Sequence, residues 1–252
     1  MIEFLGEVAA WFADAENWTG ARGLLPLTMA HVSLTLVAVS SAAVLALPGA
    51  IYLGHVSRGG FLAVSVVNIG RALPTFGVIG VLFPITLSFP VTQSPLGYWA
   101  TLLAMVVLAM PPMFVNAHAG IRGVDRSHVE AARGMGMTER QVLSEVELPL
   151  ALPLVMAGIR TAAVAVVATV TLSAWVGYNT LGAYIFVGFA QRDDVLVFVG
   201  GLVVALLAII TEVGLGWVER RADPLRRRRM PRQDGAASGS FNHQELSQSP
   251  LG

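Results

Sequence analysis

Long apolar runs separated by shorter polar segments dominate the sequence. Five of these runs approach the ~20 consecutive apolar residues that an α-helix needs to cross a bilayer. A further apolar stretch at 181–189 is too short to span alone, and it fits either a re-entrant piece or part of a split sixth helix. The pattern predicts an all-α, polytopic transmembrane helix bundle with five or six spans. The five spans are expected at approximately 24–47, 61–83, 98–119, 150–174 and 195–218.

The polar segments divide the chain into three regions. Residues 1–23 are acidic and carry apolar side chains at helical spacing, which predicts an amphipathic helix on the outer membrane surface. Residues 24–219 form the membrane domain, which is interrupted by a polar loop at about 120–149. Residues 220–252 begin with arginines and continue with a polar sequence of the kind that is typical of disorder.

Composition and charge agree with a membrane protein and predict its orientation. Hydrophobic residues make up 55% of the chain and charged residues 13%. No lysine is present, so all 16 positive side chains are arginines. Twelve of them lie in the segments after the first, third and fifth apolar runs, whereas Arg22 and Arg192 alone lie in the alternate segments. By the positive-inside rule, the amino terminus is expected outside, and the polar loop and carboxyl terminus in the cytoplasm.

The polar loop contains two capping-box patterns. In a capping box, a Ser or Thr at the start of a helix and a Glu or Gln three residues later satisfy each other's backbone amides. Ser127 is followed in this way by Glu130, and Thr138 by Gln141. Two short helices are therefore expected to begin in the loop, one at each pair.

Glycines and a proline predict how these short helices end and connect. Gly134 and Gly136 permit the positive backbone angles that end a helix, so the chain is expected to turn a corner there. Pro149 is acceptable in the first turn of a new helix, because its missing amide would be unpaired in that position anyway. The loop should therefore lead directly into the next membrane span.

The same loop carries a recognisable motif. It reads Glu130-Ala131-Ala132, three residues, Gly136, nine residues, Val146, one residue, and Leu148-Pro149. This arrangement resembles the EAA loop of membrane-spanning subunits of ATP-binding-cassette (ABC) importers, in which Ile occupies the place of Val146. Six fixed matches arise by chance about once in several million positions, so the motif is specific.

The resemblance extends over approximately 28–219 and is similar in detail to permeases for glycine betaine, carnitine and choline. Amino-acid and methionine permeases share the same architecture, so the motifs are more specific for the class of importer than for the substrate. The segments that carry the finer similarity include Pro111-Pro112, Gly134-Met135-Gly136-Met137, Glu147 to Pro153 and Gly158-Ile159-Arg160-Thr161-Ala162.

The resemblance implies a type I ABC importer permease in the bacterial inner membrane. Two such subunits would pair, either two copies of this chain or this chain and a related permease. Each would hold an ABC ATPase through its EAA loop, and an extracytoplasmic binding protein would deliver substrate. Glu130 would orient the loop helix, Gly136 would form the corner, and Val142 and Val146 would seat the second short helix. The coupling residues are expected to be Ser127, Glu130, Ala131, Ala132, Gly134, Gly136, Thr138, Gln141, Val142, Val146, Leu148 and Pro149.

Several catalytic motifs are missing from the sequence. A GxxxxGK[ST] phosphate-binding loop needs a lysine, and the chain has none. HExxH and GxSxG motifs are also absent, as is cysteine, so a membrane enzyme is poorly supported. ATP and Mg²⁺ are therefore expected on a separate ATPase subunit. No cofactor, metal or nucleic-acid partner is expected on this chain.

Polar and aromatic residues inside the spans are candidates for a translocation pathway. A central arginine such as Arg71 or Arg160 costs about 2.5–3.5 kcal/mol on insertion scales. Structural pairing, snorkelling or a wet gate is favoured over substrate contact, because a guanidinium repels a quaternary ammonium. Glu212 is expected either to pair with one of these arginines or to lie at the membrane interface. Aromatic faces near the breaks in the spans would attract such a cation, although packing is the alternative interpretation. The expected pathway residues are Asn68, Arg71, Pro74, Thr75, Phe76, Trp175 and Tyr178.

Three functions remain open from the sequence. The first is an ABC importer permease for an osmoprotectant such as glycine betaine, carnitine or choline. The second is a permease of the same class for an amino acid, methionine or another small solute. The third is a stand-alone channel or ion-coupled carrier, which would give flux in vesicles without any ATPase.

Overall fold

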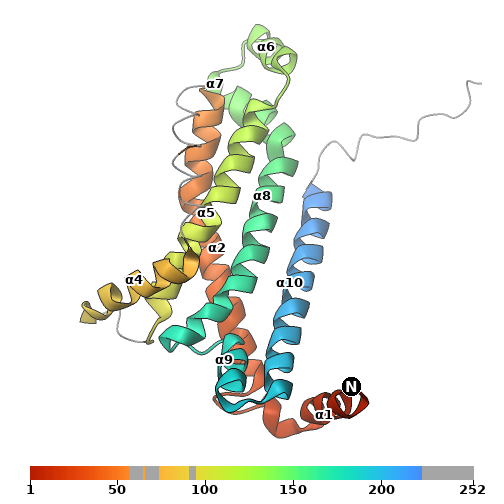
Figure 1. Ribbon diagram of the computed structural model, residues 1–252. Helices are drawn as coiled ribbons and strands as arrows, with labels where there is room; N and C mark the ends of the chain where they lie inside the picture. The colour runs from red at the N-terminus through yellow and green to blue at the C-terminus, as the bar shows by residue number, and fades with distance from the viewer. Residues whose placement is uncertain (57–64, 66–73, 91–94, 223–252) are drawn as a thin grey trace, which may run out of the picture.

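The computed structural model describes residues 1–56, 65, 74–90 and 95–222, and the regular elements within them are all helices (Figure 1). Four stretches are long and apolar enough to cross a membrane: Leu24–His55, Tyr98–Arg122, Glu139–Val176 and Asp194–Arg221. They correspond to the first, third, fourth and fifth predicted spans.

The second predicted span is described only in part. Its described portion consists of Ser65 and of residues from Pro74 onward, where α4 (Thr75–Leu87) begins. The predictions for Asn68 and Arg71, and for the tail beyond Ala222, lie outside the described residues.

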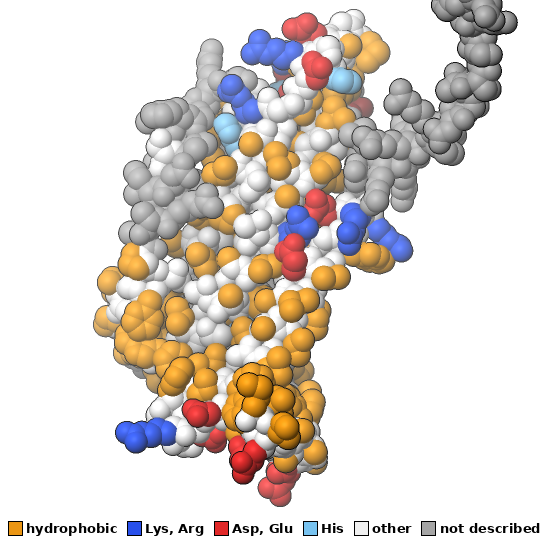
Figure 2. Space-filling view, turned by 45° about the vertical axis from the view of Figure 1, so that its right-hand side comes forward, with side chains coloured by type: hydrophobic (Ala, Val, Ile, Leu, Met, Phe, Trp, Pro, Cys, Tyr) orange, Lys and Arg blue, Asp and Glu red, His pale blue; other side chains and the backbone are white. Residues whose placement is uncertain are grey.

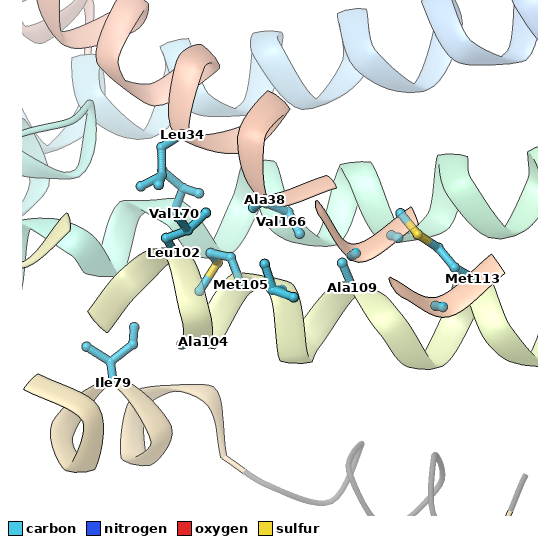
Figure 3. Close-up of a cluster of buried hydrophobic side chains, with 14 of the residues drawn as sticks. Leu34, Ala38, Ile79, Leu102, Ala104, Met105, Ala109, Met113, Val166 and Val170 are labelled. Atoms are coloured by element: carbon cyan, nitrogen blue, oxygen red, sulfur yellow. The ribbon is translucent and has the colours of Figure 1, made fainter. Parts of the chain in front are cut away.

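The bundle is built around α5 (Tyr98–Arg122), because α2 (Leu24–His55), α4 and α8 (Leu148–Thr169) all pack on it. Its core joins leucine, valine and methionine side chains to small residues (Figure 3). Small residues let the helices approach closely, since lipid gives apolar surfaces little drive to associate. A Cβ on Gly158 of α8, for instance, would lie 2.8 Å from Asn116 Cβ and 2.9 Å from the carbonyl oxygen of Pro112.

The first span is longer than predicted. Its end was expected at about residue 47, yet α2 continues through Pro48 to His55. A proline removes one backbone hydrogen bond from a helix, but neighbouring helices tolerate this within a membrane bundle. Ala46 and Ala50, on either side of Pro48, are fully or nearly fully buried. Packing against α5 and α8 therefore carries the helix past its proline and brings His55 to the end of the bundle at which the loop lies.

Short helices cover the opposite end of the bundle (Figure 1). They are α1 (Ile2–Ala13), η1 (Ala15–Trp18) and α9 (Gly182–Gln191), and α9 is too short to cross a membrane, as predicted. Phe4 of α1 packs edge-on against Phe198 of α10 (Asp194–Ala222), with ring centroids 5.4 Å apart. The loop helices α6 (Arg126–Gly134) and α7 (Glu139–Gln141) therefore lie at the opposite end of the molecule from the amino-terminal helix α1 (Figure 1).

Candidate coupling site

The EAA loop begins with α6 (Arg126–Gly134), and its N-cap differs from the prediction. Asp125 is the cap: its Oδ1 accepts a hydrogen bond of 2.9 Å from the amide of Ser127. This bond lowers the pKa of the Asp125 carboxyl below its usual value. The predicted capping box between Ser127 and Glu130 was therefore wrong, because the aspartate just upstream starts the helix two residues earlier and takes the role.

The end of α6 is a Schellman motif centred on Gly136. The amide of Gly136 donates to the carbonyl of Arg133 over 2.9 Å, and that of Met137 donates to Ala132 over 3.2 Å. Gly136 has φ +85°, the left-handed conformation that this motif requires. The prediction of a glycine corner at Gly136 is confirmed. Gly134 instead remains helical and takes no positive angle.

The segment after the corner is continuous with the next span. Thr138 and Gln141 form the predicted capping box at the start of α7 (Glu139–Gln141). A π-helical segment, η3 (Val142–Glu147), follows and runs directly into α8, with Pro149 in its first turn. The second short helix was expected to be separate, but it is the first part of a helix that continues to Val176.

A small apolar core holds α6 against η3. Val129, Ala132 and Val142 are buried in it, while Met137 and Val146 pack around them. Val142 and Val146 therefore stabilise the loop from inside and are not presented to a partner. Glu130 and Ala131 lie on the exposed side, and Met135, at the corner, is 76% exposed.

The loop is connected to the first span by His55, Glu139 and Glu147, which the sequence motif did not single out. His55, the last residue of α2, lies with its Nδ1 2.6 Å from Glu147 Oε2 and its Nε2 3.3 Å from Glu139 Oε2. Glu139 also accepts two hydrogen bonds of 2.8 Å from Arg133, which lower its pKa and raise that of Arg133. A cavity of about 230 Å³ lies beside this cluster and is lined in part by Arg122, Arg126 and Glu130.

Charged side chains gather near the two ends of the molecule, and a further group of charged side chains interrupts the largely hydrophobic surface between them (Figure 2). This distribution is the one expected for a membrane-spanning bundle. Arg160 lies within α8, and the structure pairs it with α10: Nη1 is 3.3 Å from Glu212 Oε1, and Nε is 3.5 Å from Glu219 Oε2. The expected pairing of Arg160 with Glu212 is therefore present, and Glu219 is a second partner that the sequence did not indicate.

Two of the pathway candidates, Phe76 and Trp175, lie together between the start of α4 and the end of the stretch that contains α8. Pro74 precedes α4, of which Thr75 is the first residue and Phe76 the second. The 3-10 helix η4 (Val170–Val176) directly follows α8 and carries Trp175. The Phe76 and Trp175 rings are 4.5 Å apart at an interplanar angle of 44°, and about half of each side chain is exposed. Tyr178 instead packs on Tyr98, with centroids 5.2 Å apart.

Comparison with known proteins gives the loop its context. Residues 42–224 match the family described as binding-protein-dependent transport system inner membrane component. The chain belongs to this family. It is therefore a multi-pass membrane permease subunit of a transport system.

Individual relatives of this permease subunit cover most of its length. The choline transport system permease protein OpuBB of Bacillus subtilis is 31% identical over 206 residues, which are 82% of this chain and 91% of the relative. The carnitine transport permease protein OpuCB of Listeria monocytogenes is 32% identical over 203 residues, which are 81% and 89% of the two chains.

Solved structures of importers share the fold of this permease subunit. An inward-facing structure of the MetNI methionine ABC transporter matches with a TM-score of 0.68 at 20% identity, over 77% of this chain and 93% of the other. An amino acid ABC transporter with histidines matches with a TM-score of 0.66 at 17% identity, over 86% and 98%. At these identities the likeness establishes the ABC importer permease fold and does not bear on the substrate.

Proposed function

We propose that this chain forms the translocation pathway of an ATP-driven importer for a small osmoprotectant such as glycine betaine, carnitine or choline. The names of the relatives OpuBB and OpuCB support this substrate class. ATP and Mg²⁺ bind to a separate ABC ATPase, and an extracytoplasmic binding protein delivers the substrate. A second permease subunit, either another copy of this chain or a related one, completes the pathway.

The EAA loop faces the cytoplasm and the amino terminus faces the outside in this proposal. The concentration of arginines in the loop and after the last span supports this orientation under the positive-inside rule. The fold is consistent with it, since α6 and α1 lie at opposite ends of the bundle (Figure 1).

The EAA loop receives the motion of the ATPase. The observation that carries this proposal is that the loop is a compact, internally packed unit continuous with α8, with Met135 exposed at its corner. ATP can drive transport only through its different affinity for the two conformations of the importer, so the link between ATPase and spans must be stiff. An apolar core, a capping box and a Schellman motif give the loop that stiffness.

The aromatic pair of Phe76 and Trp175 lines the pathway. Departures from regular α-helix within a membrane bundle are tolerated where they are buried or line a cavity; Phe76 follows the non-helical Pro74, and Trp175 lies in the 3-10 helix η4. Half-exposed aromatic faces attract a quaternary ammonium by cation–π interaction. The proposed site therefore fits choline, carnitine and glycine betaine, which share that group.

Photo-crosslinking at the loop tests the coupling. A photoreactive amino acid at Met135 is expected to capture the ATPase subunit in cells that produce the whole importer. The matched control is Phe189 of α9, which is 70% exposed at the opposite end and should capture no ATPase. Capture of the ATPase from position 189 and not from position 135 would overturn the proposed coupling.

Transport by the reconstituted importer tests the substrate and the need for a motor. Proteoliposomes that contain this permease, its ATPase and its binding protein should take up radiolabelled choline, carnitine or glycine betaine only when ATP is supplied to the ATPase. Uptake of methionine or another amino acid instead of these compounds would refute the proposed osmoprotectant substrate and support an amino-acid permease. Uptake through the permease alone would support a channel or carrier.

A further inference from the structure

The polar contacts between the first span and the EAA loop, within the described residues, are made by one side chain of that span, His55. The helices α5 and α8 flank the loop in the chain, so the backbone itself transmits motion to them. α2 has no such connection, since it ends at His55, far upstream of the loop in sequence. Within the described residues, the hydrogen bonds and ion pairs between α2 and the loop are those of His55 with Glu139 and Glu147.

Each ring nitrogen of His55 lies close to a glutamate of the loop. Ionised carboxylates only accept hydrogen bonds, whereas a neutral imidazole can donate from one nitrogen and an imidazolium from two. His55 has a carboxylate oxygen at each nitrogen, at 2.6 Å and 3.3 Å. His55 thus hydrogen-bonds Glu147 and lies within ion-pair distance of Glu139, and the two contacts join η3 and α7 to the end of α2.

Glu147 is the buried member of the cluster. It is 6% exposed and lies immediately before α8. A carboxylate so placed is costly unless it is paired, and within the described residues its side chain has His55 as its partner. Glu139 is more exposed and is held also by Arg133. The His55–Glu147 contact should therefore contribute more to the attachment than the contact with Glu139.

We propose that His55 is a positioning residue for energy coupling. It holds the EAA loop against the inner end of α2 through its contacts with Glu139 and Glu147, which together we call the clasp. Through this clasp, a displacement of the loop moves the first span together with α5 and α8. The close contact of Gly54, where a Cβ would lie 2.9 Å from Ile121 Cβ, keeps the end of α2 against α5 and holds His55 in reach of the loop. The proposal rests on the proposed coupling of the loop to an ATPase.

The test compares the variants His55→Gln, Glu147→Gln and the double variant in the complete reconstituted importer. Each single change removes the charged contact between α2 and η3. The amount of substrate transported per ATP hydrolysed is expected to fall about fivefold or more, while the ATPase remains bound to the permease. The double variant should be no worse than the more severe single variant, because both changes break the same contact.

Hydrogen exchange gives a readout that does not depend on transport. Amides within 139–147 are expected to exchange about 10- to 100-fold faster in His55→Gln than in the parent protein, because the loop opens more readily from α2. Glu145→Gln is the matched control: Glu145 is exposed on the same π-helical segment, and its substitution should change neither measurement. Glu139→Gln should give a smaller effect than Glu147→Gln.

Each result decides the proposal. Unchanged transport per ATP and unchanged exchange in both His55→Gln and Glu147→Gln would overturn it. Equal loss of transport in Glu145→Gln would do the same, since the effect would then not depend on the clasp. If His55→Gln does not fold, Glu147→Gln alone carries the test. If the ATPase does not bind the parent permease, the proposed function is refuted. Hydrogen exchange in His55→Gln then still shows whether the clasp holds the loop.

Discussion

Replacing Gly136 by alanine isolates the backbone cost of the corner between α6 and α7. Gly136 has φ +85°, and a Cβ placed there would meet no atom within 4 Å. The penalty therefore comes from the left-handed backbone and not from crowding, and it amounts to about 1–2 kcal/mol for an L-residue with a Cβ. This reduces the population of correctly shaped loop relative to opened loop by about 5- to 30-fold.

The size of the penalty can be graded by the choice of residue. Asparagine tolerates the left-handed region better than alanine, whereas a β-branched valine is a genuine outlier there. ATPase co-purification and uptake should therefore fall in the order Gly136→Asn, Gly136→Ala, Gly136→Val, while membrane insertion stays intact. Gly134 is the matched control, since its Cβ would also meet open space but its backbone is helical. Gly134→Ala should stabilise the helix by about 0.5–1 kcal/mol.

Two results would refute the backbone explanation of the Gly136 corner. If Gly136→Ala and Gly136→Val retain normal ATPase co-purification and normal uptake, the left-handed corner is not needed for docking. If Gly134→Ala is as damaging as Gly136→Ala, the loss comes from added side-chain bulk at the ATPase surface. The backbone account would then be wrong even though the loop mattered.

Three further predictions concern the membrane bundle. Gly158→Val should lower the free energy of unfolding by about 1–3 kcal/mol through overpacking against α5, measured as a lower melting temperature in detergent, whereas Gly201→Ala, with open space around its Cβ, should not. Arg160→Gln should lower the melting temperature more than Glu212→Gln does, because it leaves two carboxylates unpaired; equal values would contradict the pairing. Trp175→Ala should raise the KM for choline uptake about 2- to 30-fold and Trp175→Phe less, and an unchanged KM in both would remove Trp175 from the pathway.

The sequence predicted well those features that depend on residues close together in the chain. Apolar runs of sufficient length predicted five spans, and four of them are long helices within the described residues, because the length and composition of a span depend on consecutive residues. The capping box of Thr138 and Gln141 and the corner at Gly136 also depend on residues a few positions apart, and both are present.

The features that the sequence did not predict depend on competition or on distance. At the start of α6, Asp125 and Ser127 are both good cap residues, and only the course of the backbone decides between them. The first span was expected to end at about residue 47, but the helix continues through Pro48 between the buried Ala46 and Ala50. The hydrogen bond between His55 and Glu147 joins residues 92 positions apart, so no local sequence pattern could predict it. The one sequence signal that could have pointed to it is the charged Glu147 directly before an apolar span.

The central claim is that the EAA loop faces the cytoplasm, where an ATPase can reach it. The chain has no cysteine, so Met135→Cys introduces a single thiol at the exposed corner of the loop. The variant is produced without the ATPase, and intact right-side-out and inside-out membrane vesicles are treated with a membrane-impermeant maleimide. The account predicts labelling in inside-out vesicles only. Labelling in right-side-out vesicles only would place the loop outside the cell and contradict the account.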